Sequence, residues 1–188
     1  MFSEHWYNPV SIRDIWGTVG IKESTVYYHF KNKQDILDSL FIQFEEHINF
    51  LLDLLHSPDA WNNSQRSPFE WIDTYFFDRY LMDPFCNKMM RLMLIEQLHN
   101  KRFDRNTYNR WLFEEPYRIE LSTFKVLSQL GIMSSKTAEQ IGKNFYAYIT
   151  MLIFRYLLNG ELTAQKKKAF REEANSYITS NLGCLEEK

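Results

Sequence analysis

One long run of apolar residues with helical spacing constrains the fold of this chain more than any other feature. Between Ile36 and Leu55 the apolar side chains recur three or four positions apart, which is the period of one face of an α-helix. Asn32 precedes the run as a capping residue, and Asp35 follows it in the first turn. The pattern predicts a single helix over residues 33–56, about 35 Å long, and a helix of that length can connect two parts of a molecule.

The rest of the chain also favours helices. Its 188 residues include only 6 Gly and 5 Pro, whereas strands and hairpins need turn residues at short intervals. No alternating strand pattern of useful length occurs, so we expect an all-α fold. Helical spacing predicts further helices over 68–81, 85–99, 103–130 with a break near Pro116, 136–158 and 164–181.

Two short helices are predicted before the long one. Ser11 is the expected N-cap of the first, and Gly20, which tolerates a positive φ, ends it. The second begins at Glu23 or Ser24 and runs to Phe30. Two short helices across a tight glycine turn form a helix-turn-helix. Three side chains of the second helix and of the turn before it are expected to face inward: Ile21, Val26 and Phe30.

The second short helix carries Tyr, Tyr, His and Phe at positions 27 to 30. Four consecutive residues span more than one helical turn, so these rings cannot all face one core. In a helix-turn-helix protein the second helix lies in the DNA major groove, where hydroxyl and imidazole groups can bond phosphates and base edges. The alternative is that the rings pack between the short helices and the long one.

The segment "YNPVSIRDIWGTVGIKESTVYYHFKNKQDILDSL" resembles the N-terminal domain of TetR-family bacterial transcriptional regulators. It has a Ser-capped helix, a Gly-Ile turn, a Ser-Thr-x-Tyr-x-His-Phe recognition helix, then Lys-x-Lys and an apolar helix. The resemblance implies that Lys33 contacts a phosphate at the start of the long helix and that Arg13 touches the DNA backbone. It assigns to the DNA-facing surface Thr25, Tyr27, Tyr28 and His29.

The same resemblance places Glu23 and Ser24 near the bases. A carboxylate there can accept a hydrogen bond from cytosine, and it can equally repel phosphate. Residues 1–45 are then a helix-turn-helix domain, and residues 46–188 a helical ligand-binding and dimerisation domain.

The N-terminus departs from the family pattern. Members of the family begin with several more residues on a full first helix and carry a small residue where Trp6 stands. Residues 1–40 hold four Lys or Arg against five Asp or Glu, so DNA binding here depends on where the charges lie. We expect either a misassigned start or a truncated first helix with weak operator binding.

Aromatic and methionine residues are abundant in the C-terminal part of the chain. For any one of them core packing is the simpler interpretation, but together they suggest an apolar cavity with polar tips from Tyr, Arg91 or Arg118. The expected ligand is a small apolar or aromatic effector. The residues expected to contact it are Trp71, Tyr75, Met89, Met93, Trp111 and Tyr148.

The remaining expectations concern assembly and chemistry. The resemblance implies a homodimer formed by the helices at 136–158 and 164–181. No catalytic motif, cofactor-binding loop or convincing metal site is found, so an enzyme is not expected. Two distant cysteines and no leader-like segment favour the cytoplasm and free thiols, with a disulfide as the lesser alternative. The expected protein is a ligand-responsive repressor. The alternative is a helical small-molecule-binding dimer that has lost effective DNA binding.

Overall fold

The computed structural model describes residues 1–5, 7–56, 72–99, 108–129, 131 and 133–182. Within these ranges every regular element is a helix and no strand occurs, which confirms the all-α expectation. Several predicted features lie outside the described residues: the loop after His56, the beginnings of the helices expected at 68 and 103, Trp6, Trp71 and Cys184.

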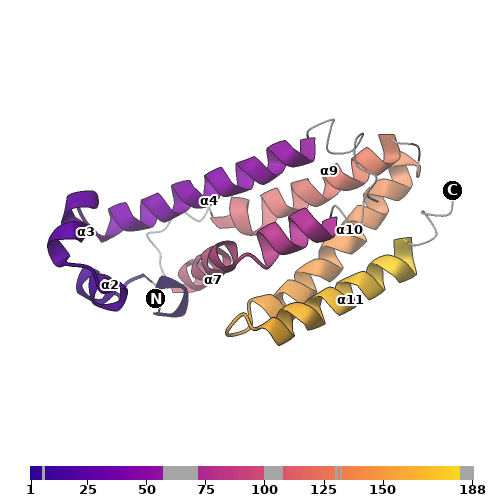
Figure 1. Cartoon of the computed structure of the whole chain (residues 1–188). Helices are drawn as coiled ribbons and strands as arrows, with labels where there is room; N and C mark the ends of the chain where they lie inside the picture. The colour runs from indigo at the N-terminus through magenta and orange to yellow at the C-terminus, as the bar shows by residue number, and fades with distance from the viewer. Residues whose placement is uncertain (6, 57–71, 100–107, 130, 132, 183–188) are drawn as a thin grey trace.

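The N-terminal helices form one end of an elongated molecule (Figure 1). They are α1 (Phe2–His5), α2 (Ile12–Val19) and α3 (Glu23–His29), and α4 (Lys33–His56) runs from them along the rest of the molecule. The bounds of α4 are those that the apolar spacing predicts. Its cap is also as predicted, because the Asn32 Oδ1 accepts a hydrogen bond from the backbone N–H of Asp35 at 3.0 Å.

A bundle of helices packs against the second half of α4 (Figure 1). Its α-helices are α7 (Pro84–His99), α9 (Glu115–Gln129), α10 (Ser135–Leu152) and α11 (Ala164–Leu182). Three π-helical segments complete it: η1 (Ile72–Leu81), η2 (Arg110–Glu114) and η3 (Ile153–Leu157).

The π-helical segments are not apparent from the apolar spacing. Their wider turns are shown by hydrogen bonds between residues five apart, such as Met82 N–H to the Phe77 carbonyl at 2.8 Å. The break expected near Pro116 is absent from the described residues. Instead η2 passes directly into α9 just before Pro116, so the helix changes there from π-helical to α-helical turns and does not end.

The buried side chains form one continuous core along α4. The core includes Val10 and Leu37 beside the N-terminal helices and Phe77, Phe124 and Phe170 within the bundle. Packing therefore shows no gap at the domain boundary expected near residue 45. Between α9 and α10 the approach is close at Gly142, since a Cβ there would lie 3.1 Å from the Phe124 ring.

Large apolar residues of α10 and α11, the two helices expected to form the dimer, are buried within the chain. Phe145, Ile149, Leu152 and Phe170 are at most 2% exposed, because α10 packs on α9, and α11 packs on η3 and α10. Outward-facing apolar side chains of this region are instead Met151 and Phe154, each 45% exposed.

Candidate functional site

The α2–α3 unit has the local geometry that its sequence predicts. The Ser11 hydroxyl accepts a hydrogen bond from the N–H of Asp14, while the Asp14 carboxylate accepts one from the N–H of Ser11, which is a capping box. Hydrogen bonding to Ser11 also lowers the pKa of Asp14. Gly20 ends α2 at φ 72°, and three residues then lead to α3. The unit is a helix-turn-helix.

The outer face of α3 is an exposed row of polar and aromatic side chains. Tyr28 is 84% exposed and Tyr27 51%, whereas Val26 on the opposite face is 4% exposed. Edge-to-face contact between the rings of Tyr28 and His29, 5.0 Å apart, holds the row together. We refer to this row as the α3 edge; its members are Glu23, Ser24, Thr25, Tyr27, Tyr28 and His29, all of them exposed.

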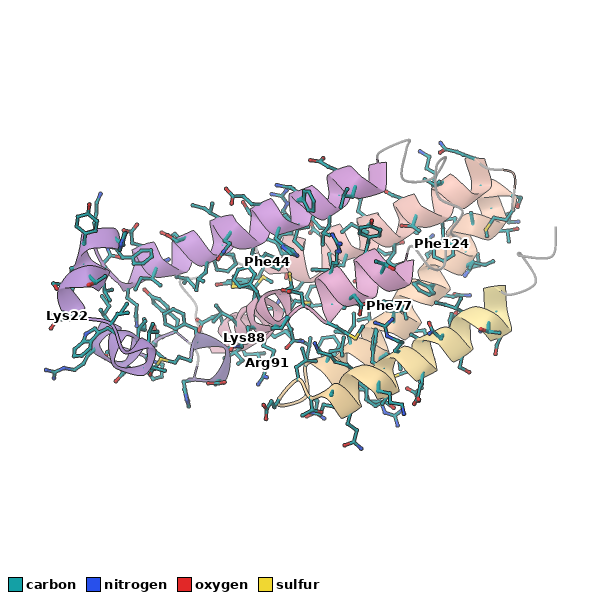
Figure 2. All side chains as sticks on the ribbon, viewed as in Figure 1. Lys22, Phe44, Phe77, Lys88, Arg91 and Phe124 are labelled. Atoms are coloured by element: carbon teal, nitrogen blue, oxygen red, sulfur yellow. The ribbon has the colours of Figure 1, made fainter. Side chains whose placement is uncertain are left out.

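Exposed cations flank the α3 edge. Arg13 lies on α2, Lys22 is the N-cap of α3, and Lys31 follows its C-terminus. Figure 2 shows Lys22 at the extreme end of the molecule, beside α2 and α3. Lys22 and Lys31 are not among the DNA-binding residues expected from the sequence, although their positions on either side of α3 would have indicated them.

Two apolar residues beside the α3 edge are exposed, and one of them differs from expectation. Ile21 was expected to face inward but is 40% exposed, and Val19 on the apolar side of α2 is 62% exposed. No described segment covers them, because α1 packs on α7 instead.

Lys33 has a structural role that the sequence does not reveal. Its ammonium group donates to the carbonyls of Tyr7 at 2.8 Å, Asn8 at 3.3 Å and Val10 at 2.9 Å. It also lies 4.0 Å from the centroid of the Tyr7 ring. Burial lowers the pKa of Lys33. Because an ammonium has three N–H groups, the phosphate contact expected of Lys33 requires it to release these carbonyls.

A buried carboxylate connects the N-terminal segment to the bundle. Glu96 on α7 is fully buried and accepts a hydrogen bond from the backbone N–H of Tyr7. Helix α1 packs on the same α7. The segment before α2 is therefore held at both ends, by Glu96 of α7 and by Lys33 of α4.

Two apolar cavities lie in the bundle. Tyr75, expected to contact an effector, lines a small one between α4, η1 and α9, together with Leu52 and Ile119. The larger one has about 490 Å³ of empty space between its walls, in part open to solvent. Its lining residues include Phe76, Tyr80, Leu112, Phe113, Glu120, Tyr146 and Phe154, and none of these seven is among the six residues expected to contact an effector.

Most of the residues expected to contact an effector are core residues instead. Met89, Met93 and Trp111 are at most 3% exposed and line neither cavity. Tyr148 stacks on Tyr177 of α11 with ring centroids 4.2 Å apart. These side chains pack between helices because each helix turns one apolar face to its neighbours; Figure 2 shows Phe44, Phe77 and Phe124 in such positions.

The two arginines expected to give the cavity polar tips are also used elsewhere. Arg91 donates to the Gly160 carbonyl at 2.6 Å. Arg118 pairs with Glu115 at 2.6 Å. Neither arginine lines the apolar cavities.

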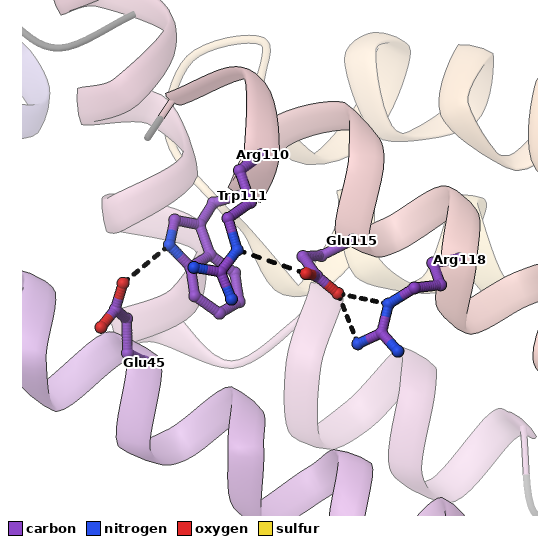
Figure 3. A network of polar contacts seen from close by, with 5 residues as sticks. All are labelled: Glu45, Arg110, Trp111, Glu115 and Arg118. Atoms are coloured by element: carbon purple, nitrogen blue, oxygen red, sulfur yellow. Dashed lines mark hydrogen bonds and ion pairs between the residues drawn. The ribbon is translucent and has the colours of Figure 1, made fainter. Parts of the chain in front are cut away.

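A polar network links η2 and α9 to the long helix α4 (Figure 3). The Trp111 indole N–H donates to Glu45 of α4 at 3.0 Å, and the Phe44 ring meets the Trp111 ring edge-to-face. Arg110 lies over the Trp111 ring and donates to Glu115 at 3.2 Å. Partial burial raises the pKa of Glu115, but the hydrogen bonds and charges of Arg118 and Arg110 outweigh it and lower the pKa overall. The network fixes one wall of the larger cavity to α4.

One cluster offers metal-ligand atoms. The side chains of His47, Asp83 and Cys86 bring one such atom each within 4.8 Å of one another. Asp83 already accepts hydrogen bonds from the N–H groups of Phe85 and Cys86 as the cap of α7. Burial raises the pKa of the Cys86 thiol, which opposes the thiolate that metals bind. Capping of α7 accounts for the place of Asp83, and the His47 ring bonds the Arg79 carbonyl at 2.9 Å.

The geometry defines a class of protein: an all-helical chain whose N-terminal helix-turn-helix carries an exposed second helix suited to DNA. Residues 1–40 match the family model of bacterial regulatory proteins, tetR family. This N-terminal part, about a fifth of the chain, is therefore similar to the TetR family, as its motif suggests.

A curated relative points the same way. The chain is similar to IcaR, the HTH-type negative transcriptional regulator of the biofilm operon icaADBC in Staphylococcus epidermidis. The two are 30% identical over 78 residues, which make up 42% of this chain and 40% of IcaR. The match thus spans less than half the length of either protein. No solved structure matched the chain. Among the described residues, no helix is both long and apolar enough to cross a bilayer.

Proposed function

We propose that this protein is a sequence-specific DNA-binding transcriptional regulator that acts as a ligand-responsive repressor. The observation that carries the proposal is the α3 edge, an exposed aromatic and polar row on the second helix of a helix-turn-helix. The family match over residues 1–40 supports it. The similar protein IcaR is named a negative regulator, which favours repression. Operator binding implies action in the cytoplasm.

The proposed DNA contacts follow from position. Thr25, Tyr27, Tyr28 and His29 face the major groove, where hydroxyl and imidazole groups bond base edges and phosphates. Arg13, with Lys22 and Lys31, lies beside them and contacts the DNA backbone. Glu23 and Ser24 stand at the start of α3, nearest the bases.

A homodimer through the surface of α10 and α11 completes the proposal. Two recognition helices can reach successive major grooves only when they lie about 34 Å apart in a two-fold arrangement. The exposed Met151 supplies apolar surface on α10.

The proposed response to a ligand uses the connection between cavity and α4. A ligand in the larger cavity contacts Leu112 and Phe113 of η2. The neighbouring Trp111 is bonded to Glu45 of α4, and α4 begins beside α3. A ligand that binds one arrangement of η2 better than the other shifts the position of α4, and with it the spacing of the two α3 helices.

The test is a gel shift on the DNA upstream of the gene, with wild type and Tyr28→Ala. We expect wild type to bind specifically and Tyr28→Ala to bind about tenfold more weakly, which corresponds to ~1.4 kcal/mol. Phe50→Ala is the matched control, because Phe50 is 56% exposed on α4, away from α3. No specific retention of wild type at low salt would overturn the proposal.

The second candidate is a helical small-molecule-binding dimer that has lost effective DNA binding. It is favoured by the use of Lys33 within the fold and by the excess of acidic over basic residues in 1–40. Ligand binding without DNA retention in the same experiments would support it.

A further inference from the structure

We propose that the larger cavity is a binding site for a lipophilic amine, with the Glu120 carboxylate as the partner of the basic nitrogen. We call it the Glu120 cavity. The proposal names the chemical class of the effector, and in its regulatory meaning it rests on the function proposed above. It stands on three observations: the chemistry of the walls, the unpaired oxygen of Glu120, and the helices that meet there.

The walls of the Glu120 cavity are almost wholly apolar. Phe76, Leu81 and Met90 form part of them, and Phe113 and Phe154, 37% and 45% exposed, lie at the surface end. Aromatic and thioether side chains of this kind hold flat or flexible hydrocarbon groups. The cavity is in part open to solvent, which gives a ligand a route of entry.

Glu120 is the exception in this lining. It is 3% exposed, and its Oε1 has no hydrogen-bond partner among the described residues. Nearby, the Tyr146 hydroxyl already has partners, because it donates to the Phe113 carbonyl at 3.2 Å and bonds Thr150. Leaving a buried oxygen unpaired is unfavourable for folding. A ligand that donates a hydrogen bond to Oε1 removes that penalty.

The charge of the cavity selects the ligand class. Among the described lining residues, the ionisable groups are Glu120, Tyr80 and Tyr146, and none is a cation. Burial raises the pKa of Glu120 to about 8, so near neutral pH it is largely protonated when the cavity holds no ligand. A protonated amine entering the cavity supplies the missing positive charge. The bound ammonium group stabilises the ionised form of Glu120, so Glu120 releases its proton to the buffer.

The helices that surround the Glu120 cavity also indicate a functional site. All three π-helical segments contribute walls: Tyr80 comes from η1, Leu112 from η2 and Ile153 from η3. π-Helical turns in proteins occur frequently at functional sites, and each widens the helix locally. Three of the described π-helical segments therefore meet at this one cavity.

The experiment is calorimetric titration of the full chain near neutral pH with three probes that share one hydrocarbon body: phenylbutylamine, phenylbutanol and phenylbutyrate. We expect the amine to bind at least about tenfold more tightly than the alcohol, as for hydrogen bonds to charged groups, and the carboxylate to bind most weakly. Binding of the amine should release protons, seen as a heat that depends on the ionisation enthalpy of the buffer.

Glu120→Gln is expected to abolish both the preference for the amine and the proton release, while still binding the alcohol. Glu114→Gln is the matched control, because Glu114 is exposed on the adjoining η2 and does not line the cavity. Equal binding of amine and alcohol by wild type, no binding of either, or a preference retained in Glu120→Gln would overturn the proposal. The comparison of amine and alcohol binding by wild type tests the proposal even if Glu120→Gln does not fold. These titrations contain no DNA, so a failure of operator binding is detected separately by the gel shift.

Discussion

Val26 and Tyr28 lie two positions apart on α3 and have opposite surroundings, 4% and 84% exposed. A helix rotates about 100° per residue, so positions two apart lie on nearly opposite faces. For this reason the sequence alone allowed the side chains around the aromatic run to be divided into an inward-facing set and an outward-facing set. The exposure of Tyr27 and Tyr28 is as expected, and their contact with DNA stays a prediction.

Replacement of Lys33 by Met tests its role in the fold. The variant leaves three carbonyls of residues 7 to 10 without their donor, so we expect the free energy of unfolding to fall by about 1–3 kcal/mol. Denaturant unfolding measures the change. Lys31→Met is the control, since the Lys31 side chain is exposed. Equal stability of the two variants would show that the carbonyls are satisfied by water.

Glu120 predicts an unusual pH dependence of stability. Its pKa is raised by burial to about 8 in the folded state from an ordinary value of 4.5, so between these values the folded protein holds a proton that the unfolded chain releases. The free energy of unfolding therefore falls as pH rises through this window, on the order of 1 kcal/mol per pH unit. Glu120→Gln should remove this slope, so that the difference between variant and wild type grows from pH 5 to pH 8. Thermal unfolding across the series measures it; parallel curves would contradict it.

At the scale of elements, caps and apolar spacing identified α2, α3 and α4 nearly to the residue. They did so because Ser11, Gly20 and Asn32 act within a few residues of their own positions. The π-helical segments escaped prediction because a π-turn and an α-turn put similar residues on the apolar face. Only packing against neighbouring helices distinguishes them.

The larger cavity escaped prediction for the same reason. Glu120 is one carboxylate in an amphipathic sequence. Its neighbours in the sequence do not indicate that its side chain on α9 faces η1 and α10. Conversely, Met93 and Trp111 were expected at a ligand, but whether a large apolar residue lines a cavity or fills it depends on partners distant in sequence.

The turn between α2 and α3 gives a matched pair of glycine substitutions. Gly20 has φ 72°, which disfavours any side chain, whereas Gly17 lies within α2 with open space where a Cβ would be. We expect Gly20→Ala to lower the free energy of unfolding by about 1 kcal/mol and Gly17→Ala to raise it by about 0.5–1 kcal/mol. Denaturant unfolding of both variants is the measurement. Equal effects would mean that the turn relaxes.

At the scale of the whole molecule, the proposed dimer is open to a direct test. Met151 is 45% exposed on α10 and lines neither apolar cavity. A carboxylate at the centre of an apolar interface would be buried without a partner, so Met151→Glu should give a monomer by light scattering after gel filtration. Phe50→Glu on α4 is the control and should keep the assembly of wild type. A dimer that persists in Met151→Glu would place the interface elsewhere.

The hydrogen bond between Tyr7 and Glu96 has a different kind of consequence. Its donor is a main-chain amide, and every residue except proline offers that group. Substitutions at position 7 other than proline therefore keep this hydrogen bond to α7, although they lose the contact of the Tyr7 ring with Lys33. Position 96 has no such tolerance, because only a side chain that places a hydrogen-bond acceptor at the same distance can replace Glu96.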